Sequence, residues 1–206
     1  MPSIYGLKPG FQNLLRPLVN GLARIGVSAN QVTIAGLLLS LIAGVMIAWA
    51  RGGRMLLILP AVLFLRMALN AMDGMLAREH GKKTSLGALL NELGDVIADA
   101  GLYLPLAVVP GFDARLVVGV VVLSILTEMT GVVAVQIGAS RRYDGPFGKS
   151  DRAFIFGLLG LLLGLRVAVE RAIPILLWAM ICLLVVTIVN RSRRALQEVS
   201  VGVAKR

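Results

Sequence analysis

Six long apolar runs divide this chain into segments that each have the length of a membrane-spanning helix. They cover approximately residues 31–50, 55–78, 85–109, 115–137, 152–169 and 172–190. A helix needs about 20 mostly apolar residues to cross a bilayer, and 57% of the residues here are hydrophobic. The breaks between the runs are short, which favours antiparallel neighbours in one domain. We predict an all-α integral membrane protein in which residues 28–194 form a bundle of six transmembrane helices.

The first 27 residues predict a helix that lies along the membrane surface. No apolar core follows the first charge, as a signal peptide would require. Between residues 8 and 26, polar and apolar residues recur on opposite sides of a helix, as in an amphipathic interfacial helix. The apolar side holds Phe11, Leu14, Leu15, Leu18, Val19, Leu22 and Ile25, and the polar side holds Lys8, Gln12, Arg16, Asn20 and Arg24. With a cytoplasmic tail over residues 195–206, residues 1–206 make a single membrane domain.

Basic residues are distributed unevenly between the two predicted sides of the membrane. If the amino terminus is cytoplasmic, 15 of the 21 Lys and Arg residues lie inside, five lie outside, and Arg66 lies within a helix. The positive-inside rule then places both termini in the cytoplasm, and the formal net charge of +10 adds attraction to anionic lipids. The basic residues are scattered without interleaved aromatics, so nucleic-acid binding is not expected. We expect a multi-pass protein of the bacterial inner (plasma) membrane.

Two sets of polar residues interrupt the second and third apolar runs. They are Asn70, Asp73 and Ala77, and Asn91, Asp95 and Asp99. Each set occupies one helical face, and the short basic loop between the helices brings both faces to the same cytoplasmic depth. Their oxygen atoms suit a hard cation such as Mg²⁺ or Mn²⁺. Polar groups inside a membrane mark functional sites, although an inert polar zipper between two helices is an alternative.

A longer pattern runs through the same segment. It consists of Asp73, Gly74, Ala77, Arg78, an eight-residue spacer, Gly87 and Asp95. This pattern resembles the motif of the CDP-alcohol phosphatidyltransferase family, which is Asp-x2-Asp-Gly-x2-Ala-Arg, about eight residues, then Gly-x3-Asp-x3-Asp. Asn70 and Asn91 stand at the first and third aspartate positions. The stretch from Ser28 to Thr33 also resembles the polar entry to the family's first spanning helix.

The resemblance implies a transferase that moves a phosphatidyl group from a CDP-linked lipid, CDP-diacylglycerol, to an alcohol and releases CMP. It implies a homodimer and a pair of divalent cations held by four aspartates, the last of which is also the general base. Carried onto this chain, Asp73 and Asp95 ligate the metal, Asn70 and Asn91 are weaker ligands, and Asp95 deprotonates the acceptor. The donor nucleotide is held by Asp73, Gly74, Ala77, Arg78 and Gly87. Because two carboxylates balance one dication, two alternatives are favoured: one tightly held Mg²⁺ or Mn²⁺, or a second ion recruited mainly by the substrate's pyrophosphate.

The segment from Lys149 to Arg152 allows two interpretations. In the first, Ser150 caps a helix and Asp151 favours the helix dipole. In the second, Lys149, Arg152 and Arg141 bind an acidic group of the acceptor or a lipid phosphate. The sequence supports both readings equally.

Other charged residues lie within or beside the apolar runs. Arg66 and Glu128 are each near the middle of a predicted helix, and we expect them to pair with each other. Glu92 and Asp99 are close enough in sequence to the polar sets to be considered as substitutes for the missing aspartates, although Glu92 is predicted to face elsewhere and Asp99 to sit one turn deeper.

Two further functions stay open. One is a catalytically impaired family member that binds a nucleotide lipid or a phospholipid, because Asn70 and Asn91 each remove a negative charge. The other is a transferase that takes a small CDP-alcohol as donor and diacylglycerol as acceptor. The residues do not identify the acceptor alcohol.

Overall fold

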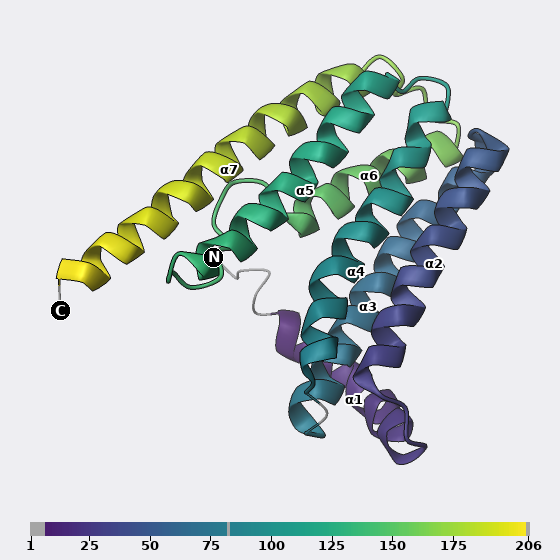
Figure 1. Cartoon of the computed structure of the whole chain (residues 1–206). Coiled ribbons are helices and arrows are strands. Elements are labelled where there is room, and N and C mark those ends of the chain that lie inside the picture. Colours follow the sequence, from purple (N-terminus) through teal and green to yellow (C-terminus); the bar gives the residue numbers. More distant parts are fainter. Residues whose placement is uncertain (1–6, 82, 205–206) are drawn as a thin grey trace. The chain divides into compact units, whose positions relative to one another are not determined.

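The structure, a computed structural model, describes residues 7–81 and 83–204, and the side chains among them at 10–81 and 83–201 (Figure 1). Lys8, Lys82, Lys205 and Arg206, which were counted as inside charges, have side chains outside these limits. The chain packs as two compact units. One comprises the chain up to Ala43 together with 61–99, and the other comprises 44–60 together with the chain from Ala100 onward. Each unit is described by itself.

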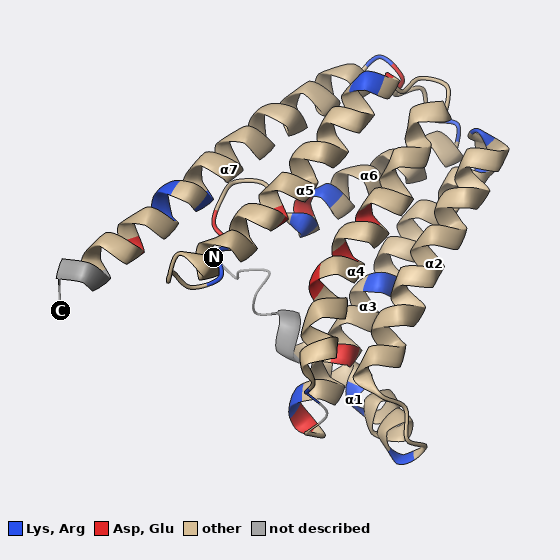
Figure 2. Cartoon of the chain, viewed as in Figure 1, with Lys and Arg blue, Asp and Glu red and all other residues tan. Residues whose placement is uncertain are grey.

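Every element of regular structure in the described residues is a helix, which confirms the all-α prediction. The α-helices are α1 (Leu7–Arg24), α2 (Ala29–Ala50), α3 (Ile58–Glu79), α4 (Ser85–Tyr103), α5 (Ala114–Gln136), α6 (Lys149–Gly164) and α7 (Ile173–Ala204), and the 3₁₀ helices are η2 (Gly53–Leu57) and η3 (Leu104–Val108). Figure 2 shows long stretches of α2, α5 and α7 without charge.

Four segments are long and apolar enough to cross a membrane. They are Ala29–Ala50, Gly53–Glu79, Ala114–Gln136 and Ile173–Val201. Large apolar side chains on these segments point outward, as lipid-facing residues do, and Trp49 near the end of α2 is 90% exposed. The helix α4 carries Glu92, Asp95 and Asp99, and α6 has only 16 residues. The chain is therefore an integral membrane protein, whereas the count of six spans stays a prediction.

In the first unit, α1 packs against α2 and α3. The contact is a buried cluster of Val19, Ala29, Val32, Met72, Met75 and Leu76. On another side of α1, Leu14 and Leu18 are 75% and 55% exposed, and Arg16 forms an ion pair of 2.9 Å with Glu79 at the end of α3. A helix with one packed side and one exposed apolar side suits the predicted position at a membrane surface.

In the second unit, α5 lies along α7 (Figure 1) and α6 packs on η2. Small residues allow the closest approaches, as is usual between membrane helices. A Cβ atom on Gly44 would overlap the carbonyl oxygen of Gly101, and one on Gly160 would lie 3.0 Å from Leu59. Tyr103 and Phe156 stack with their ring centroids 4.4 Å apart.

Two predicted helix ends differ from the structure. The fifth apolar run continues to residue 169, but α6 ends at Gly164 because Arg166 adopts a left-handed φ of 63°. The amides of Arg166 and Val167 then bond to the carbonyls of Leu163 and Leu162, which is a Schellman stop without the usual glycine. In the other direction, α7 continues 14 residues past the predicted end at 190, as far as Ala204.

Candidate active site

The helices α3 and α4 bring the two polar faces together, as the spacing predicted. The Asn70 side-chain amide donates a hydrogen bond of 3.1 Å to Asp95 Oδ1. On the neighbouring turn of α3, Asp73 is 6% exposed, and its Oδ2 accepts a hydrogen bond of 2.8 Å from the Thr33 hydroxyl of α2. Buried carboxylates need such partners to stay ionised. Asn91 lies on the exposed side of α4, one turn before Asp95.

Arg66 joins this site, which the sequence reasoning missed. Its Nη1 lies 2.7 Å from Asp99 Oδ1, and its Nη2 lies 3.6 Å from Asp95 Oδ1. Both Arg66 and Asp99 are almost fully buried, at 4% and 6% exposure. The signal was present in the spacing, because Arg66 precedes Asn70 by one helical turn and so shares its face. The predicted pairing of Arg66 with Glu128 is wrong.

Glycines shape the entrance to the motif. A Cβ atom on Gly74 would lie 3.1–3.4 Å from the guanidinium of Arg78, which folds back along α3. A Cβ atom on Gly87 would lie 2.7 Å from Asn30 Oδ1 and 3.0 Å from the Thr84 hydroxyl, which accepts the Gly87 amide proton at the start of α4. A side chain at either position would make these neighbouring side chains shift. Ala77 is half-buried and packs on the cluster that holds α1.

The donor atoms near Asp73 and Asp95 suit one divalent cation. Among the described residues, no group of three or more His, Cys, Asp or Glu side chains is arranged to hold a metal ion. The donors that remain are the carboxylates of Asp73 and Asp95 and the amide oxygens of Asn70 and Asn91. All are hard oxygen ligands, which suit a divalent cation such as Mg²⁺ or Mn²⁺.

A second polar cluster lies in the other unit, where three arginines surround Glu128 of α5. Arg141, Arg152 and Arg191 approach its carboxylate to 3.6, 3.3 and 3.5 Å. Arg152 and Arg191 are 1% and 2% exposed. Three guanidinium groups thus share one carboxylate in a largely buried setting, where charges need partners.

The sequence predicted Arg141 and Arg152 as members of a basic site, and the structure brings them together. It places Lys149 at the first residue of α6, away from the contacts of Glu128. Arg191 was missed, since nothing in its local sequence distinguishes it from a positive-inside residue after an apolar run. The predicted Ser150 cap is also wrong. The N-cap of α6 is Gly148, two residues earlier, and the Gly148 amide donates to Asp151 at 2.8 Å.

With both clusters described, comparison with known proteins decides the family. The sequence model described as CDP-alcohol phosphatidyltransferase matches residues 27–189. The chain belongs to this family. The matched region contains the α3–α4 site together with Arg141 and Arg152. It ends within α7, two residues before Arg191.

Two curated relatives cover almost the whole of this family member. The inner membrane protein YnbA of Escherichia coli (strain K12) is 48% identical over 195 residues, which are 94% of this chain and 96% of that protein. The phosphatidylinositol phosphate synthase of Corynebacterium glutamicum is 30% identical over 198 residues, which are 93% of this chain and 87% of that protein.

Solved structures show the same fold. The Mycobacterium tuberculosis phosphatidylinositol phosphate synthase with CDP-DAG bound matches with a TM-score of 0.72 and 23% identity, over 89% of this chain and 92% of that chain. The same synthase in complex with manganese and citrate matches with a TM-score of 0.75 and 23% identity, over 87% of each chain. This similarity establishes the architecture of the family member.

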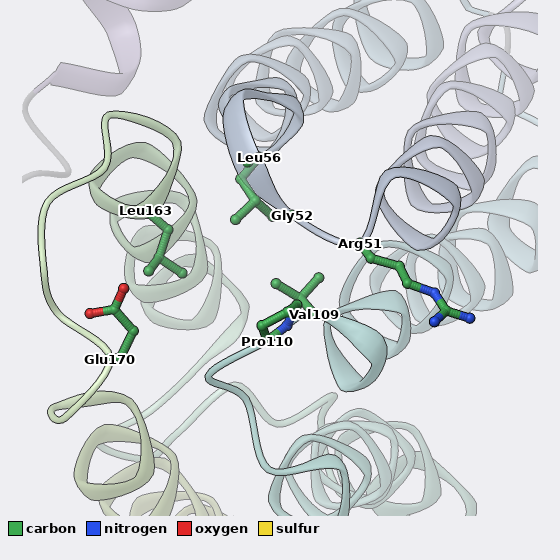
Figure 3. A pocket seen from close by; sticks show the side chains of 8 residues that line it. Arg51, Gly52, Leu56, Val109, Pro110, Leu163 and Glu170 are labelled. Atoms are coloured by element: carbon green, nitrogen blue, oxygen red, sulfur yellow. The ribbon is translucent and has the colours of Figure 1, made fainter.

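A pocket of about 190 Å³ lies at the carboxyl end of α6, at the opposite end of that helix from Arg152 (Figure 3). It is lined by Arg51, Gly52, Gly53, Leu56, Val109, Pro110, Leu163 and Glu170. Figure 3 shows the Arg51 side chain directed away from the other lining groups. The pocket contains no residue of the family motif.

Proposed function

We propose that this family member transfers a phosphatidyl group from CDP-diacylglycerol to an alcohol and releases CMP, at the cytoplasmic face of a bacterial inner membrane. The observation that carries the proposal is the meeting of Asn70 and Asp95 across α3 and α4, with Asp73 one turn away and Arg78 and Gly74 beside it. The family membership, a relative named as an inner membrane protein and a similar fold with CDP-DAG bound all support it.

In this proposal each residue of the α3–α4 site has one task. Asp73 and Asp95, with the amide oxygens of Asn70 and Asn91, hold a divalent cation. That cation neutralises the donor's phosphates and makes the phosphorus more electrophilic when bound. Arg78 contacts a phosphate oxygen through its guanidinium, which Gly74 allows to fold against α3. Asp95 accepts the proton of the acceptor hydroxyl while that oxygen bonds to the lipid-bearing phosphorus and the bond to CMP breaks.

The acceptor is an alcohol that carries an anionic group. Arg141, Arg152 and Arg191 converge on Glu128, and guanidinium groups bind phosphate and carboxylate through paired hydrogen bonds. The relatives named as phosphatidylinositol phosphate synthases support a phosphorylated alcohol. Lys149, at the start of α6, provides a further positive charge on the same helix as Arg152.

The decisive experiment measures CMP release by the purified full-length protein with CDP-diacylglycerol and Mg²⁺ or Mn²⁺. Glycerol 3-phosphate, inositol phosphate, inositol and serine are supplied separately, and the lipid product is identified by mass spectrometry. We expect CMP and a new phospholipid with a phosphorylated alcohol, and neither product from the Asp95→Asn variant. Release with inositol alone would contradict the anionic acceptor, and release with serine alone would contradict a phosphorylated one. Release only from a CDP-alcohol with diacylglycerol would reverse the donor assignment.

A binding protein without catalysis is the second candidate, and Asn70 and Asn91 favour it because each lacks the charge of an aspartate. It predicts CDP-diacylglycerol binding with no CMP release from any acceptor. Saturable binding by calorimetry together with inactivity in the assay above would replace the transferase proposal with this one.

A further inference from the structure

The α4 carboxylates of the candidate site face an arginine and an amide of α3 in matching order. Arg66 and Asn70 are one turn apart on α3, and Asp99 and Asp95 are one turn apart on α4. Arg66 contacts Asp99 at 2.7 Å, and Asn70 contacts Asp95 at 3.1 Å. Arg66 also reaches Asp95, at 3.6 Å. The two helices are therefore joined by a ladder in which α3 donates and α4 accepts.

Water has little access to the Arg66–Asp99 end of the ladder. The side chains of Arg66 and Asp99 are 5% and 8% exposed, and that of Asp95 is 29% exposed. Two carboxylates one turn apart on a buried helical face repel each other and need a compensating positive charge. A guanidinium between them provides that charge permanently, because arginine does not lose its proton in proteins.

Arg66 brings one positive charge to the carboxylates of Asp95 and Asp99. A second divalent cation at these two carboxylates would lie beside the guanidinium, and like charges at short range repel strongly where water is largely excluded.

We propose that Arg66, assisted by the Asn70 amide, takes the place of a second divalent cation at Asp95 and Asp99. The site accordingly binds one divalent ion per chain, and Arg66 orients Asp95 from the side opposite that ion. The inference rests on the proposed function only in assigning a divalent-ion site to Asp73 and Asp95. Arg66 is in this sense a positioning residue, acting through Asp95 rather than on the substrate.

The test counts Mn²⁺ bound to the purified full-length protein in detergent, by the electron paramagnetic resonance signal of the free ion. We expect one Mn²⁺ per wild-type chain. Arg66→Met should tighten Mn²⁺ binding by tenfold or more or add a second ion, because it removes the guanidinium that competes with a cation for Asp95 and Asp99. Arg66→Lys, which keeps the charge, should behave as wild type. Arg16→Met is the matched control, since Arg16 forms its ion pair with Glu79, outside the ladder.

A second set of variants restores the carboxylates instead of removing the arginine. Asn70→Asp places an oxygen where the amide nitrogen now lies 3.1 Å from Asp95. Asn70→Asp with Asn91→Asp should therefore gain a weak second Mn²⁺ site, and adding Arg66→Met should make that site at least tenfold tighter. Circular dichroism and gel filtration identify variants that fold.

Two bound Mn²⁺ ions in the wild-type protein, or none, would overturn the inference without any variant. A folded Arg66→Met protein with unchanged Mn²⁺ count and affinity would also overturn it. The same holds if the second site binds Mn²⁺ equally tightly with and without Arg66→Met in the protein that carries Asn70→Asp and Asn91→Asp. These outcomes are separate from a failure of the proposed function, which is the absence of CMP release from every acceptor while one Mn²⁺ still binds.

Discussion

At the scale of single residues, Asp73 depends on Thr33 for its orientation. The Thr33 hydroxyl donates to Asp73 and is itself positioned on α2, so α2 and α3 meet at this carboxylate. A metal ligand that is held by a hydrogen bond has less rotamer freedom to lose when the ion arrives. Thr33 belongs to the polar stretch from Ser28 to Thr33 at the start of α2.

Asp73→Ala should abolish divalent-ion binding at this site. The variant removes one of the two carboxylates at the motif, so its effect should exceed the roughly 10- to 100-fold loss of metal affinity that follows removal of an outer partner. Mn²⁺ affinity and CMP release are both measured on protein that elutes as wild type from gel filtration. Asp113→Asn is the matched control, because Asp113 caps α5 through its side-chain oxygen, which asparagine retains. Unchanged Mn²⁺ affinity in folded Asp73→Ala would exclude Asp73 from the site.

Helical periodicity predicted which motif residues face each other but not all of their partners. The spacing of Asn70 and Asp95 placed them on facing sides of two antiparallel helices, and their hydrogen bond follows from that. The partner of Arg66 depends on the relative depth of α3 and α4, which the residues of either helix alone do not specify. Glu128 meets three arginines from segments distant in sequence. Such contacts are set by tertiary packing rather than by any local pattern.

At the scale of the helices, close packing in the second unit depends on glycine. Gly44→Ala should destabilise the protein by about 1–3 kcal/mol or more, since its methyl group would overlap the Gly101 carbonyl and overpacking has costs of this order. The apparent melting temperature in detergent should fall. Gly36→Ala is the control on the same helix, because the added atom would lie 3.7 Å from Leu69, at ordinary contact distance. Equal melting temperatures for the two variants would contradict the close approach.

The connection between α5 and α6 is fastened to α7 by ion pairs. Asp144 contacts Arg142 at 2.6 Å and Arg194 at 2.9 Å. Burial opposes ionisation of Asp144, but the hydrogen bond and charge of Arg142, followed by the charge of Arg194, outweigh it and lower the pKa of Asp144 below its ordinary value of 3.8.

This shift predicts a pH dependence of stability. Because the folded-state pKa of Asp144 is depressed, its contribution is complete above the ordinary value of 3.8 and is lost as the pH falls through the folded-state pKa. Asp144→Asn should therefore lower the apparent melting temperature at neutral pH by a modest amount, since solvent screens surface ion pairs. The difference from wild type should shrink below the ordinary value. A difference that stays constant into that acid range would contradict the assignment.

Helix boundaries show where hydropathy stops being informative. The apolar run of residues 152–169 predicted too long a helix. The helix stops because Arg166 adopts a left-handed backbone conformation, which an arginine in the sequence does not predict. The predicted end at 190 was too early, because the polar last turns of α7 are stabilised by contacts such as Glu198 with Arg142 rather than by lipid. The four apolar segments of membrane-spanning length were predictable from composition, and the residues at which helices end were not.

At the scale of the whole molecule, the uneven distribution of basic residues predicts the orientation in the membrane. Cys182, the only cysteine, is exposed on α7 and is first replaced by alanine. Pro146→Cys should then react with an impermeant maleimide only from the cytoplasmic side, and Arg54→Cys only from the opposite side. Arg54 is preferred to Gly52 in the same connection, because Gly52 has a φ of 123° that a side chain would strain. Labelling with the two sides exchanged would contradict the cytoplasmic site.

The length of α7 affects the conformational entropy that the protein loses when it binds a ligand. At 1.5 Å per residue its 32 residues measure about 48 Å, against about 30 Å of hydrocarbon. The surplus turns hold residues 140–144 through Glu198 and Arg194. Confining one backbone residue costs about 1–2 kcal/mol of conformational entropy, and here that loss occurs during folding. Arg141 sits within the confined stretch, so in the proposed acceptor site it would give up little freedom on closing on an anion, and the long helix would thereby improve affinity without touching the ligand.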